Sequence, residues 1–245
     1  MRHASAVLFV AVAVVSPAHA GSPANETLPP AFDVIALFEF DGNTLDTSGN
    51  ARHATLIGGD FVGSRYGSAL QVIEGDVEGV AFPMGIDWSP YAGLLVHPYT
   101  VEILFTPIDA LMSGDYQKLF SNADASDGGW YYVDQSFQAY SDGATLGGGT
   151  LAANQLIYLA IVSTAPDQIE VFFNGQSIGI GPKGFTGTPA EAIFFRDDAG
   201  TSRNEQLTGQ IEVLRISDIA RTGAEIATIA EQFPFFSDGF ETPDF

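Results

Sequence analysis

The stretch FEFDGNTLDTSGNARHAT, residues 38–55, decides the fold. An apolar run that reads as a strand enters a turn rich in Asp, Asn and Gly, and a second short strand-like run follows at once. Asp41, Asn43 and Asp46 place oxygen donors in this one turn, and such donors can enclose a hard cation such as Ca²⁺. The same side chains can instead bond to nearby backbone groups and stabilise the turn alone. The pattern leaves both interpretations open.

Outward from this stretch, the chain continues as short apolar or alternating runs separated by Gly, Asp, Asn, Ser and Pro. In YTVEILFTP (99–107), apolar residues alternate with polar ones, which is typical of a strand with one buried face. Asn174-Gly175 lies between two such runs and is a strong hairpin signal, because both residues tolerate positive φ. Strands are expected at 33–40, 53–57, 67–73, 77–83, 99–107, 117–121, 130–134, 137–141, 155–163, 169–174, 176–180, 191–196 and 208–217. So many short strands with turns between them predict an antiparallel sandwich or barrel.

One helix is expected, at 223–232. Thr222 and Glu225 have the spacing of a capping box, in which each side chain bonds to the other residue's backbone N–H. The apolar residues that follow have helical spacing and form one stripe: Ile226, Ile229, Ala230 and Phe233. A single short helix after many strands is expected to cover an edge or a face of a sheet.

The two ends of the chain differ from this pattern. Residues 1–20 combine a basic start, a short apolar run and Ala-His-Ala, which predicts a secretory signal peptide and therefore a secreted or cell-surface location. Residues 21–31 are rich in Pro and small residues and are expected to be a leader. Residues 32–233 are predicted to form one domain, because no interior linker divides them. Residues 234–245 mix aromatic and acidic residues and read as an edge strand, a frayed end or an attachment signal.

Charge and cysteine content restrict the function. The formal net charge is −21, and a strongly acidic chain is a poor match for nucleic acid or an anionic membrane surface, which both attract Lys and Arg. Acidity favours solubility and cation uptake, although adaptation to high salt produces the same bias. No cysteine is present, so a single large hydrophobic core must supply the stability. No apolar run is long enough to predict a transmembrane helix.

The order of the motifs resembles the bacterial laminin-G-like (LamG-like) jelly roll of the concanavalin A-like lectin/glucanase superfamily. The motifs that carry the resemblance are residues 38–55, YTVEILFTP (99–107), IEVFFNGQSIG (169–179) and GQIEVLRISDIARTGAEIATIA (209–230). The resemblance implies an all-β, two-sheet antiparallel jelly-roll sandwich with one short C-terminal helix. It also implies an exported domain that binds carbohydrate or another extracellular ligand. The ending FSDGFE resembles that of many exported proteins of Gram-negative bacteria.

The resemblance further implies one structural Ca²⁺ near the rim of a sheet. It brings Glu212, which stands where the family has Asp, alongside the first strand. The expected ligands are Asp41, Asn43, Asp46, Glu212 and a backbone carbonyl near His53. Such an ion would pin the first strand to the last. A turn stabilised by its own side chains remains the alternative.

Aromatic residues supply the candidate ligand-binding groups. The rings of Trp88, Tyr91, Trp130 and Tyr132 are the proposed set for stacking on sugars, and Tyr131, Tyr140, Asp127 and Asp142 are further candidates. Strand aromatics usually pack in a core, so packing is the favoured role for Trp130 and Tyr132. Trp88 and Tyr91 lie in the loop GIDWSPYAG, where binding and packing are both open.

Catalysis is not predicted. Glu102, Glu170 and Glu212 are each the single acid of an apolar strand and are expected to face solvent, and the paired-acid string of laminarinase-type enzymes is absent. Past residue 20, His53 and His97 are the only histidines, which makes zinc unlikely on chemical grounds. Arg215 is expected to form a structural ion pair. The pairs Asp197-Asp198 and Asp124-Asp127 are expected in solvated loops.

The sequence therefore predicts an exported, non-catalytic protein that binds glycan or another extracellular ligand. A glycoside hydrolase or polysaccharide lyase of the same fold, and a structural or adhesive surface protein, are the alternatives. The side chains on the open face of a sheet discriminate among them. Paired acids indicate hydrolysis, exposed rings indicate glycan binding, and neither is expected of an adhesive protein.

Overall fold

The computed structural model describes residues 33–64, 67–73, 76–77, 80–81, 83–108, 116–125, 127–140, 144–149, 151–199 and 205–233. The expected signal peptide, leader and tail lie outside these residues, as does Asp142. Within the described part of the chain, no helix has the length and apolar character needed to cross a membrane.

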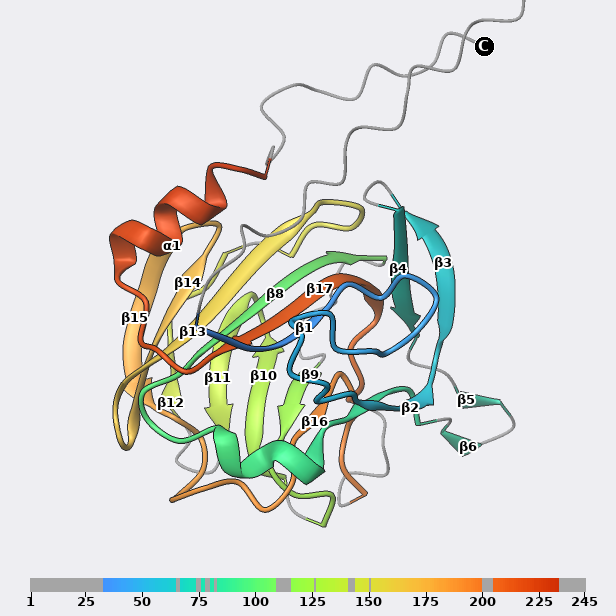
Figure 1. Ribbon diagram of the computed structural model, residues 1–245, viewed down its shortest axis with the longest axis horizontal. Coiled ribbons are helices and arrows are strands. Elements are labelled where there is room, and N and C mark those ends of the chain that lie inside the picture. The colour runs from blue at the N-terminus through green and yellow to red at the C-terminus, as the bar shows by residue number, and fades with distance from the viewer. Residues whose placement is uncertain are drawn as a thin grey trace, which may run out of the picture.

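The larger of two sheets is antiparallel and contains eight strands (Figure 1). Its order is β15-β14-β13-β8-β17-β4-β3, and β1 also pairs with β17. The strands are β1 (Val34–Phe38), β3 (Asp60–Ser64), β4 (Gly67–Val72), β8 (Thr100–Pro107), β13 (Ile157–Ala165), β14 (Gln168–Phe173), β15 (Gln176–Pro182) and β17 (Gly209–Ser217). The first strand thus lies beside the last, as the resemblance implied.

The smaller sheet has seven strands in the order β12-β11-β10-β9-β16-β7-β2. They are β2 (Thr55–Gly58), β7 (Gly85–Asp87), β9 (Tyr116–Ser121), β10 (Gly129–Val133), β11 (Ser136–Tyr140), β12 (Ala144–Thr145) and β16 (Ile193–Phe194). A third sheet has only two strands, β5 (Asp76–Val77) and β6 (Val80–Ala81). A 3-10 helix, η1 (Ser89–Leu94), follows β7.

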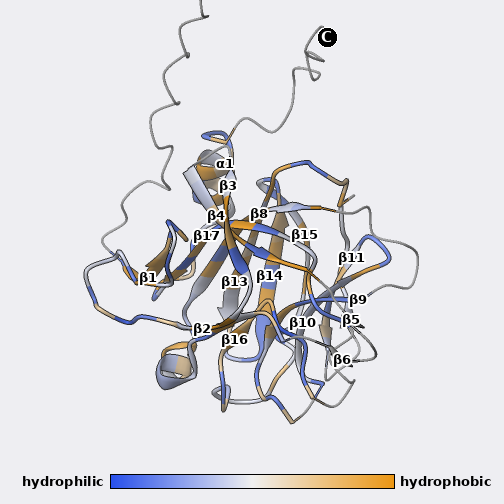
Figure 2. Cartoon of the chain, turned by 90° about the vertical axis from the view of Figure 1, so that its right-hand side faces the viewer, coloured by the Kyte–Doolittle hydropathy of each residue, from blue (hydrophilic) through white to orange (hydrophobic). Residues whose placement is uncertain are grey.

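The core lies between the two sheets. Alternation along β8 turns Val101, Ile103 and Phe105 inward, where they join one large buried cluster with residues of both sheets. Hydrophobic segments follow the strands accordingly (Figure 2). The predicted all-β, two-sheet antiparallel sandwich with a short C-terminal helix is confirmed.

The helix α1 (Gly223–Ala230) covers the outer face of the larger sheet (Figure 1). Ile226, Ile229 and Ala230 pack there against apolar side chains of the sheet in a second buried cluster. The predicted capping box is present, since Thr222 accepts from the Glu225 N–H and Glu225 accepts from the Thr222 N–H. The helix ends two residues before the predicted end. Among the described residues, no helix packs on the outer face of the smaller sheet in the same way.

Candidate functional site

Asp46 stabilises the first turn through its own carboxylate. Its Oδ1 accepts the backbone N–H groups of Leu37 and Ser48, both at 2.9 Å, and its Oδ2 accepts that of Arg52 at 2.9 Å. Burial raises the pKa of Asp46, but the bonds from Ser48, Arg52 and Leu37 outweigh this effect and the pKa lies below its usual value. Both oxygens of Asp46 therefore already serve the turn, in agreement with the alternative to a metal ligand.

Asn43 and His53 are also used within the turn. The Asn43 amide accepts the Leu45 N–H at 2.8 Å and donates to the Asp41 carbonyl at 2.9 Å, which closes a local side-chain turn. His53 Nδ1 accepts the Asp46 N–H at 3.0 Å. These bonds explain the Asp- and Asn-rich sequence of the turn without an ion.

Glu212 lies at a bulge of β17, between the partners of Phe105 and Leu104 on β8. Its side chain is buried, which corrects the expectation that it faces solvent, and its Oε2 accepts the Ser64 hydroxyl at 2.6 Å. Ser64 pairs with Gly67 across the β3–β4 hairpin, and a Cβ added to Gly67 would lie 3.3 Å from Asp41 Oδ1. The structure thus brings Asp41 and Glu212 to the same hairpin end. Burial raises the pKa of Glu212, and the hydrogen bond from the Ser64 hydroxyl offsets part of this rise. The net pKa is about 7.

Within the described part of the chain, no group of three or more His, Cys, Asp or Glu side chains is arranged to hold a metal ion. Of the five expected calcium residues, the structure draws two carboxylates, Asp41 and Glu212, toward one hairpin. The remaining three bond within the first turn. A calcium ion therefore stays a prediction.

Three of the four expected ligand-binding rings are in the core, and this placement corrects the expectation for them. Trp88, Trp130 and Tyr132 are fully buried, so no ring face is exposed for a sugar. The indole of Trp88 donates to the Arg52 carbonyl at 2.9 Å, and that of Trp130 donates to the Lys183 carbonyl at 2.8 Å. Packing, the favoured role for Trp130 and Tyr132, is what the structure shows.

Tyr91 is half-buried and packs on Trp88, with ring centroids 5.6 Å apart. It follows Trp88 into η1, where its N–H donates to the Trp88 carbonyl at 2.9 Å. Tyr91 thus keeps some exposure at the end of the sandwich, but its described ring partner is another core residue.

A row of tyrosines instead lies on the outer face of the smaller sheet. Because Trp130 and Tyr132 point into the core, Tyr131 between them on β10 points outward. Its ring meets Tyr116 of β9 and Tyr140 of β11 edge-on, each at 5.8 Å between centroids. Tyr140 is 38 % exposed and Tyr116 is half-buried, so the two outer members of this tyrosine row reach the surface.

Lys118 lies under the tyrosine row and is 0 % exposed. It faces Tyr131 across the β9–β10 pair, and its Nζ donates to the Tyr131 hydroxyl and, at 2.9 Å, to Asp198. The hydroxyl of Tyr131 in turn donates to Asp127, whose Oδ1 is 3.6 Å from Lys118 Nζ. We call these four residues, Lys118, Asp127, Tyr131 and Asp198, the lysine cluster.

The acids around the lysine cluster come from two connections between strands, β9–β10 and β16–β17. Asp197 and Asp198 follow β16 and are fully buried, which corrects the expectation that they lie in a solvated loop. Asp127 precedes β10 and is 33 % exposed. Burial raises the pKa of Glu205 to about 7, and the nearby charges of Asp197 and Asp127 add to this effect. The site therefore has an excess of negative charge.

Sequence reasoning found part of this site. Tyr131, Tyr140 and Asp127 were among the further candidates, whereas Lys118, Tyr116, Asp198 and Glu205 were missed. Strand alternation through Trp130-Tyr131-Tyr132 carried the signal, because only the middle ring can face away from the other two. The pairing of Lys118 with Tyr131 depends on a bulge between β9 and β10, which the sequence pattern does not reveal.

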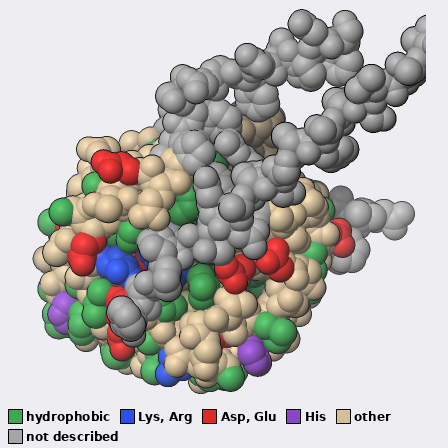
Figure 3. Space-filling model, turned by 45° about the horizontal axis from the view of Figure 1, so that its top comes forward, with side chains coloured by type: hydrophobic (Ala, Val, Ile, Leu, Met, Phe, Trp, Pro, Cys, Tyr) green, Lys and Arg blue, Asp and Glu red, His purple; other side chains and the backbone are tan. Residues whose placement is uncertain are grey.

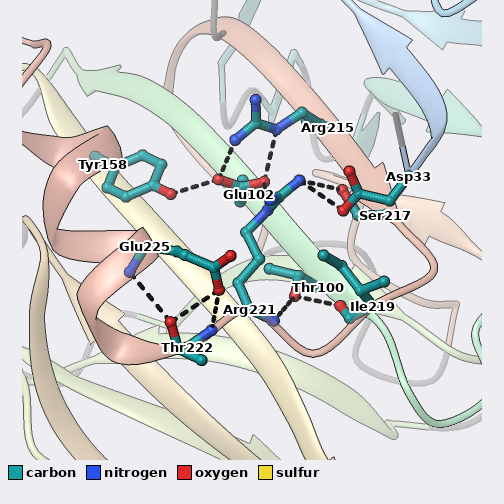
Figure 4. A network of polar contacts seen from close by, with 10 residues as sticks. All are labelled: Asp33, Thr100, Glu102, Tyr158, Arg215, Ser217, Ile219, Arg221, Thr222 and Glu225. Atoms are coloured by element: carbon teal, nitrogen blue, oxygen red, sulfur yellow. Dashed lines mark hydrogen bonds and ion pairs between the residues drawn. The ribbon is translucent and has the colours of Figure 1, made fainter. Parts of the chain in front are cut away.

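A second polar network lies on the opposite outer face, beneath α1 (Figure 4). Glu102 is fully buried there, which corrects the expectation that it faces solvent. Arg215 donates to both of its oxygens, Arg221 donates at 3.3 Å, and the Tyr158 hydroxyl donates at 2.5 Å. Arg221 also pairs with Asp33 at 3.1 Å. The predicted structural ion pair of Arg215 is confirmed.

Comparisons with known proteins give matches to solved structures alone. No protein-family model matches the chain, and no curated protein matches it. The structure is similar to domain 4 of AbnA, an extracellular arabinanase from Geobacillus stearothermophilus, solved with arabinotriose. The TM-score is 0.56 at 20 % identity, and the match covers 81 % of this chain and 98 % of that domain.

Two solved structures of toxins are also similar. One is the binding domain of Paraclostridial Mosquitocidal Protein 1 (TM-score 0.58, 12 % identity), and the other is from a study of the entry of botulinum neurotoxin type C into cells (TM-score 0.55, 10 % identity). Each match covers 81 % of this chain and about half of the solved chain, 52 % and 51 % respectively. At these identities the likeness concerns the fold alone, that of a two-sheet antiparallel β-sandwich.

Proposed function

We propose that this chain is an exported, non-catalytic protein that binds carbohydrate on the outer face of the smaller sheet. The tyrosine row carries the proposal. Tyr116 and Tyr140 expose aromatic surface beside Asp127, a partly exposed carboxylate. A ring packs against the apolar face of a sugar, and a carboxylate accepts hydrogen bonds from hydroxyl groups.

The comparisons support this proposal through the fold. The similar arabinanase domain was solved with arabinotriose, and cell entry of the similar type C toxin depends on two ganglioside molecules. Those ligands belong to those proteins. For this chain they support the proposal by analogy of fold only, together with the predicted signal peptide, which would send the chain out of the cell.

The acids of the site favour binding over hydrolysis. Glycoside hydrolysis requires two carboxylates that face the substrate, about 5–5.5 Å apart or wider. Asp198 is fully buried, and Asp127 and Asp198 both contact the ammonium of Lys118. The carboxylate beside the exposed rings therefore has no second free carboxylate in the lysine cluster with which to act.

A glycoside hydrolase or lyase remains the second candidate because of one observation. The pKa of Glu205 is raised to about 7, a value suited to a general acid. Incubation of the protein with soluble polysaccharides, followed by assays for reducing ends and for unsaturated products, tests this candidate. We expect neither product to form.

A glycan array with the full-length mature protein tests the binding proposal. We expect wild-type binding to at least one oligosaccharide and a loss of about tenfold in affinity for Tyr140→Ala, which corresponds to about 1.4 kcal/mol. Ile180→Ala is the matched control, since Ile180 is an exposed apolar residue at the edge of the other sheet. Equal affinities for both variants would contradict this surface, and an array without binding would favour the adhesive alternative.

We further propose the structural Ca²⁺ at the hairpin end where Asp41 and Glu212 approach. Both supply the carboxylate oxygens that Ca²⁺ prefers, and Glu212 is buried against a neutral hydroxyl, that of Ser64. A bound ion would offset the cost of burying this charge and tie β17 to the turn after β1.

Thermal melts test the calcium proposal. We expect a higher melting temperature in Ca²⁺ than in chelator for wild type, and no such difference for Glu212→Gln. Glu170→Gln is the control, because Glu170 accepts a serine hydroxyl at the same 2.6 Å on the protein surface. A wild-type melting temperature that is the same in Ca²⁺ and in chelator would contradict the calcium proposal.

A further inference from the structure

We infer that Lys118 is a positioning residue of the proposed glycan-binding face: its buried ammonium fixes, through Tyr131, the carboxylate of Asp127 that a ligand meets. This inference rests on the proposed function for its biological meaning. Its geometry concerns the lysine cluster and can be tested without a ligand.

The first step is the burial of a charge that has its partners inside the protein. Lys118 has no exposed side-chain surface, and a lysine ammonium has three N–H donors. Asp198, equally buried, accepts at 2.9 Å, and the Tyr131 hydroxyl accepts a second bond. Asp127 adds a carboxylate oxygen at 3.6 Å. The Lys118 ammonium therefore cannot reach a ligand and must act through these neighbours.

The second step is the direction of the hydrogen bonds. Lys118 donates to the Tyr131 oxygen, and the Tyr131 hydroxyl then donates to Asp127 Oδ1. Burial, followed by the hydrogen bond and charge of Asp127, raises the pKa of Tyr131, so the phenol keeps the proton that it donates. A chain of bonds thus runs from a fully buried cation to a carboxylate that is one third exposed.

The third step is the charge that Lys118 offsets. Asp127 faces this region from the β9–β10 connection, and Asp197, Asp198 and Glu205 face it from the β16–β17 connection. Lys118 contacts both Asp127 and Asp198. Without it, Asp198 would be a buried carboxylate repelling Asp127. Because Asp127 lies outside a strand, we expect it to turn away from the tyrosine row, toward water.

The backbone of Lys118 makes a separate contribution to the fold. Its N–H donates to the Glu205 carbonyl at 2.7 Å, which ties β9 to the segment before β17. A substitution of the side chain leaves this bond in place. The role of the ammonium can therefore be separated from the role of the strand.

Two variants test the inference in the full mature chain. Lys118→Met keeps much of the volume and removes the charge, and the double variant Lys118→Met, Asp198→Asn also removes the buried negative charge that Lys118 offsets. We expect Lys118→Met to lower the melting temperature and the double variant to recover most of it. If the sole role of Lys118 were to neutralise Asp198, the double variant would also recover the hydrogen bond from Tyr131 to Asp127.

The geometry is read by NMR of tyrosine-labelled protein without ligand. In wild type, we expect the Tyr131 hydroxyl proton to exchange slowly with water because it is bonded to Asp127. We expect this signal to be lost in Asp127→Ala, which removes the acceptor, in Lys118→Met and in the double variant. A hydroxyl signal that survives in the double variant would overturn the positioning role.

Affinity supplies the second measurement, with arabinotriose and the strongest array oligosaccharide as probes. We expect about a tenfold loss in the double variant at recovered thermal stability, and affinity near wild type would overturn the inference. Failure of the proposed function has a different signature, since wild type would then bind no oligosaccharide while the NMR result still decides whether Lys118 fixes Tyr131 and Asp127.

Discussion

The two outer faces of the sandwich carry polar clusters of the same composition with opposite access to water. Beneath α1, a buried cation, a tyrosine hydroxyl and a carboxylate meet as Arg215, Tyr158 and Glu102 (Figure 4). On the smaller sheet the same three kinds of group meet as Lys118, Tyr131 and Asp127. All three residues of the first cluster are buried, whereas the second cluster ends at the partly exposed carboxylate of Asp127.

The difference shows which polar residues serve the fold and which remain available to a ligand. Glu102 is the shared acceptor of two arginines and a tyrosine and is fully buried, so its carboxylate cannot reach a ligand outside the protein. In the lysine cluster, the acceptor at the end of the chain of bonds lies beside exposed rings. The space-filling view likewise shows acidic side chains at several places on the surface (Figure 3). Negative charge alone therefore does not identify the candidate site. The hydrogen-bond partners and the exposure of each acid do.

Breaking the closed network should give the largest effect on stability. We expect Arg215→Met to reduce the free energy of unfolding by about 3–5 kcal/mol, because Glu102 then stays buried without the guanidinium that donates to both of its oxygens. Urea denaturation measures this change. Glycan affinity of the folded variant should stay at the wild-type value, since α1 and the candidate face lie on different sheets.

The double variant Arg215→Met, Glu102→Leu is the control for that experiment. Replacement of a buried ion pair by apolar residues is often neutral or stabilising, so we expect it to recover much of the loss. A loss that remains in the double variant would mean that packing around Arg215, and not its charge, holds this face together.

The pH dependence of stability sharpens the comparison, because Glu212 is a buried acid that bonds to a hydroxyl and not to a cation. Its folded-state pKa of about 7 lies above the usual value of 4.5. The folded state therefore binds more protons between these values, and the stabilisation present below pH 4.5 is lost as the pH rises through 7. We expect a loss on the order of 2 kcal/mol in chelator, measured by urea denaturation from pH 4 to 8.

Two variants identify the group responsible. Glu212→Gln should reduce this slope and be more stable than wild type at pH 8 in chelator, while Glu170→Gln should follow wild type. Glu205 contributes a slope of the same sign, so some dependence should remain. An unchanged slope in Glu212→Gln would show that Glu212 is ionised in the folded protein at neutral pH.

The fold was largely predictable because it depends on local patterns. Alternation along 99–107, the Asn174-Gly175 hairpin and the Thr222 capping box each specify an element without distant contacts, and all three are present. The strands that were missed, β3, β7 and β12, are short, and two of them contain Gly. Their pairing comes from neighbouring strands and not from their own sequence.

The candidate site was less predictable because it depends on register and burial. Trp88 and Tyr131 are both aromatic candidates in the sequence, yet Trp88 fills the core and Tyr131 lies in the tyrosine row. Glu102 has the sequence pattern of a surface acid. Its burial depends on α1 and the segment before α1, which are distant in the sequence. Asp197 and Asp198 read as a loop, and their burial arises from contacts with residues far away in the sequence, such as Lys118.

Removing one hydroxyl from each cluster tests the comparison directly. Tyr158→Phe deletes a bond inside the closed network, so we expect a loss of about 1.5 kcal/mol in stability and no change in glycan affinity. Tyr131→Phe deletes the bond to Asp127, so we expect a several-fold loss of affinity in addition to a similar loss of stability. Titration calorimetry and urea denaturation of both variants provide the readouts. Equal affinities in the two variants would mean that the two faces do not differ in function.

The smallest effect concerns the helix that closes one face and has no counterpart on the other. Thr222→Ala removes the side chain that accepts the Glu225 N–H at 3.3 Å, and we expect a loss of about 1 kcal/mol. Hydrogen exchange of the α1 amides should accelerate, while the amides of β10 keep their wild-type rates. Thr228→Ala is the control, because Thr228 is also exposed on α1 but bonds within the helix to the Ala224 carbonyl. If the α1 amides exchange at the same rate in both variants, the cap does not hold α1 over Glu102. The apolar packing of the helix against the larger sheet would then keep that face closed.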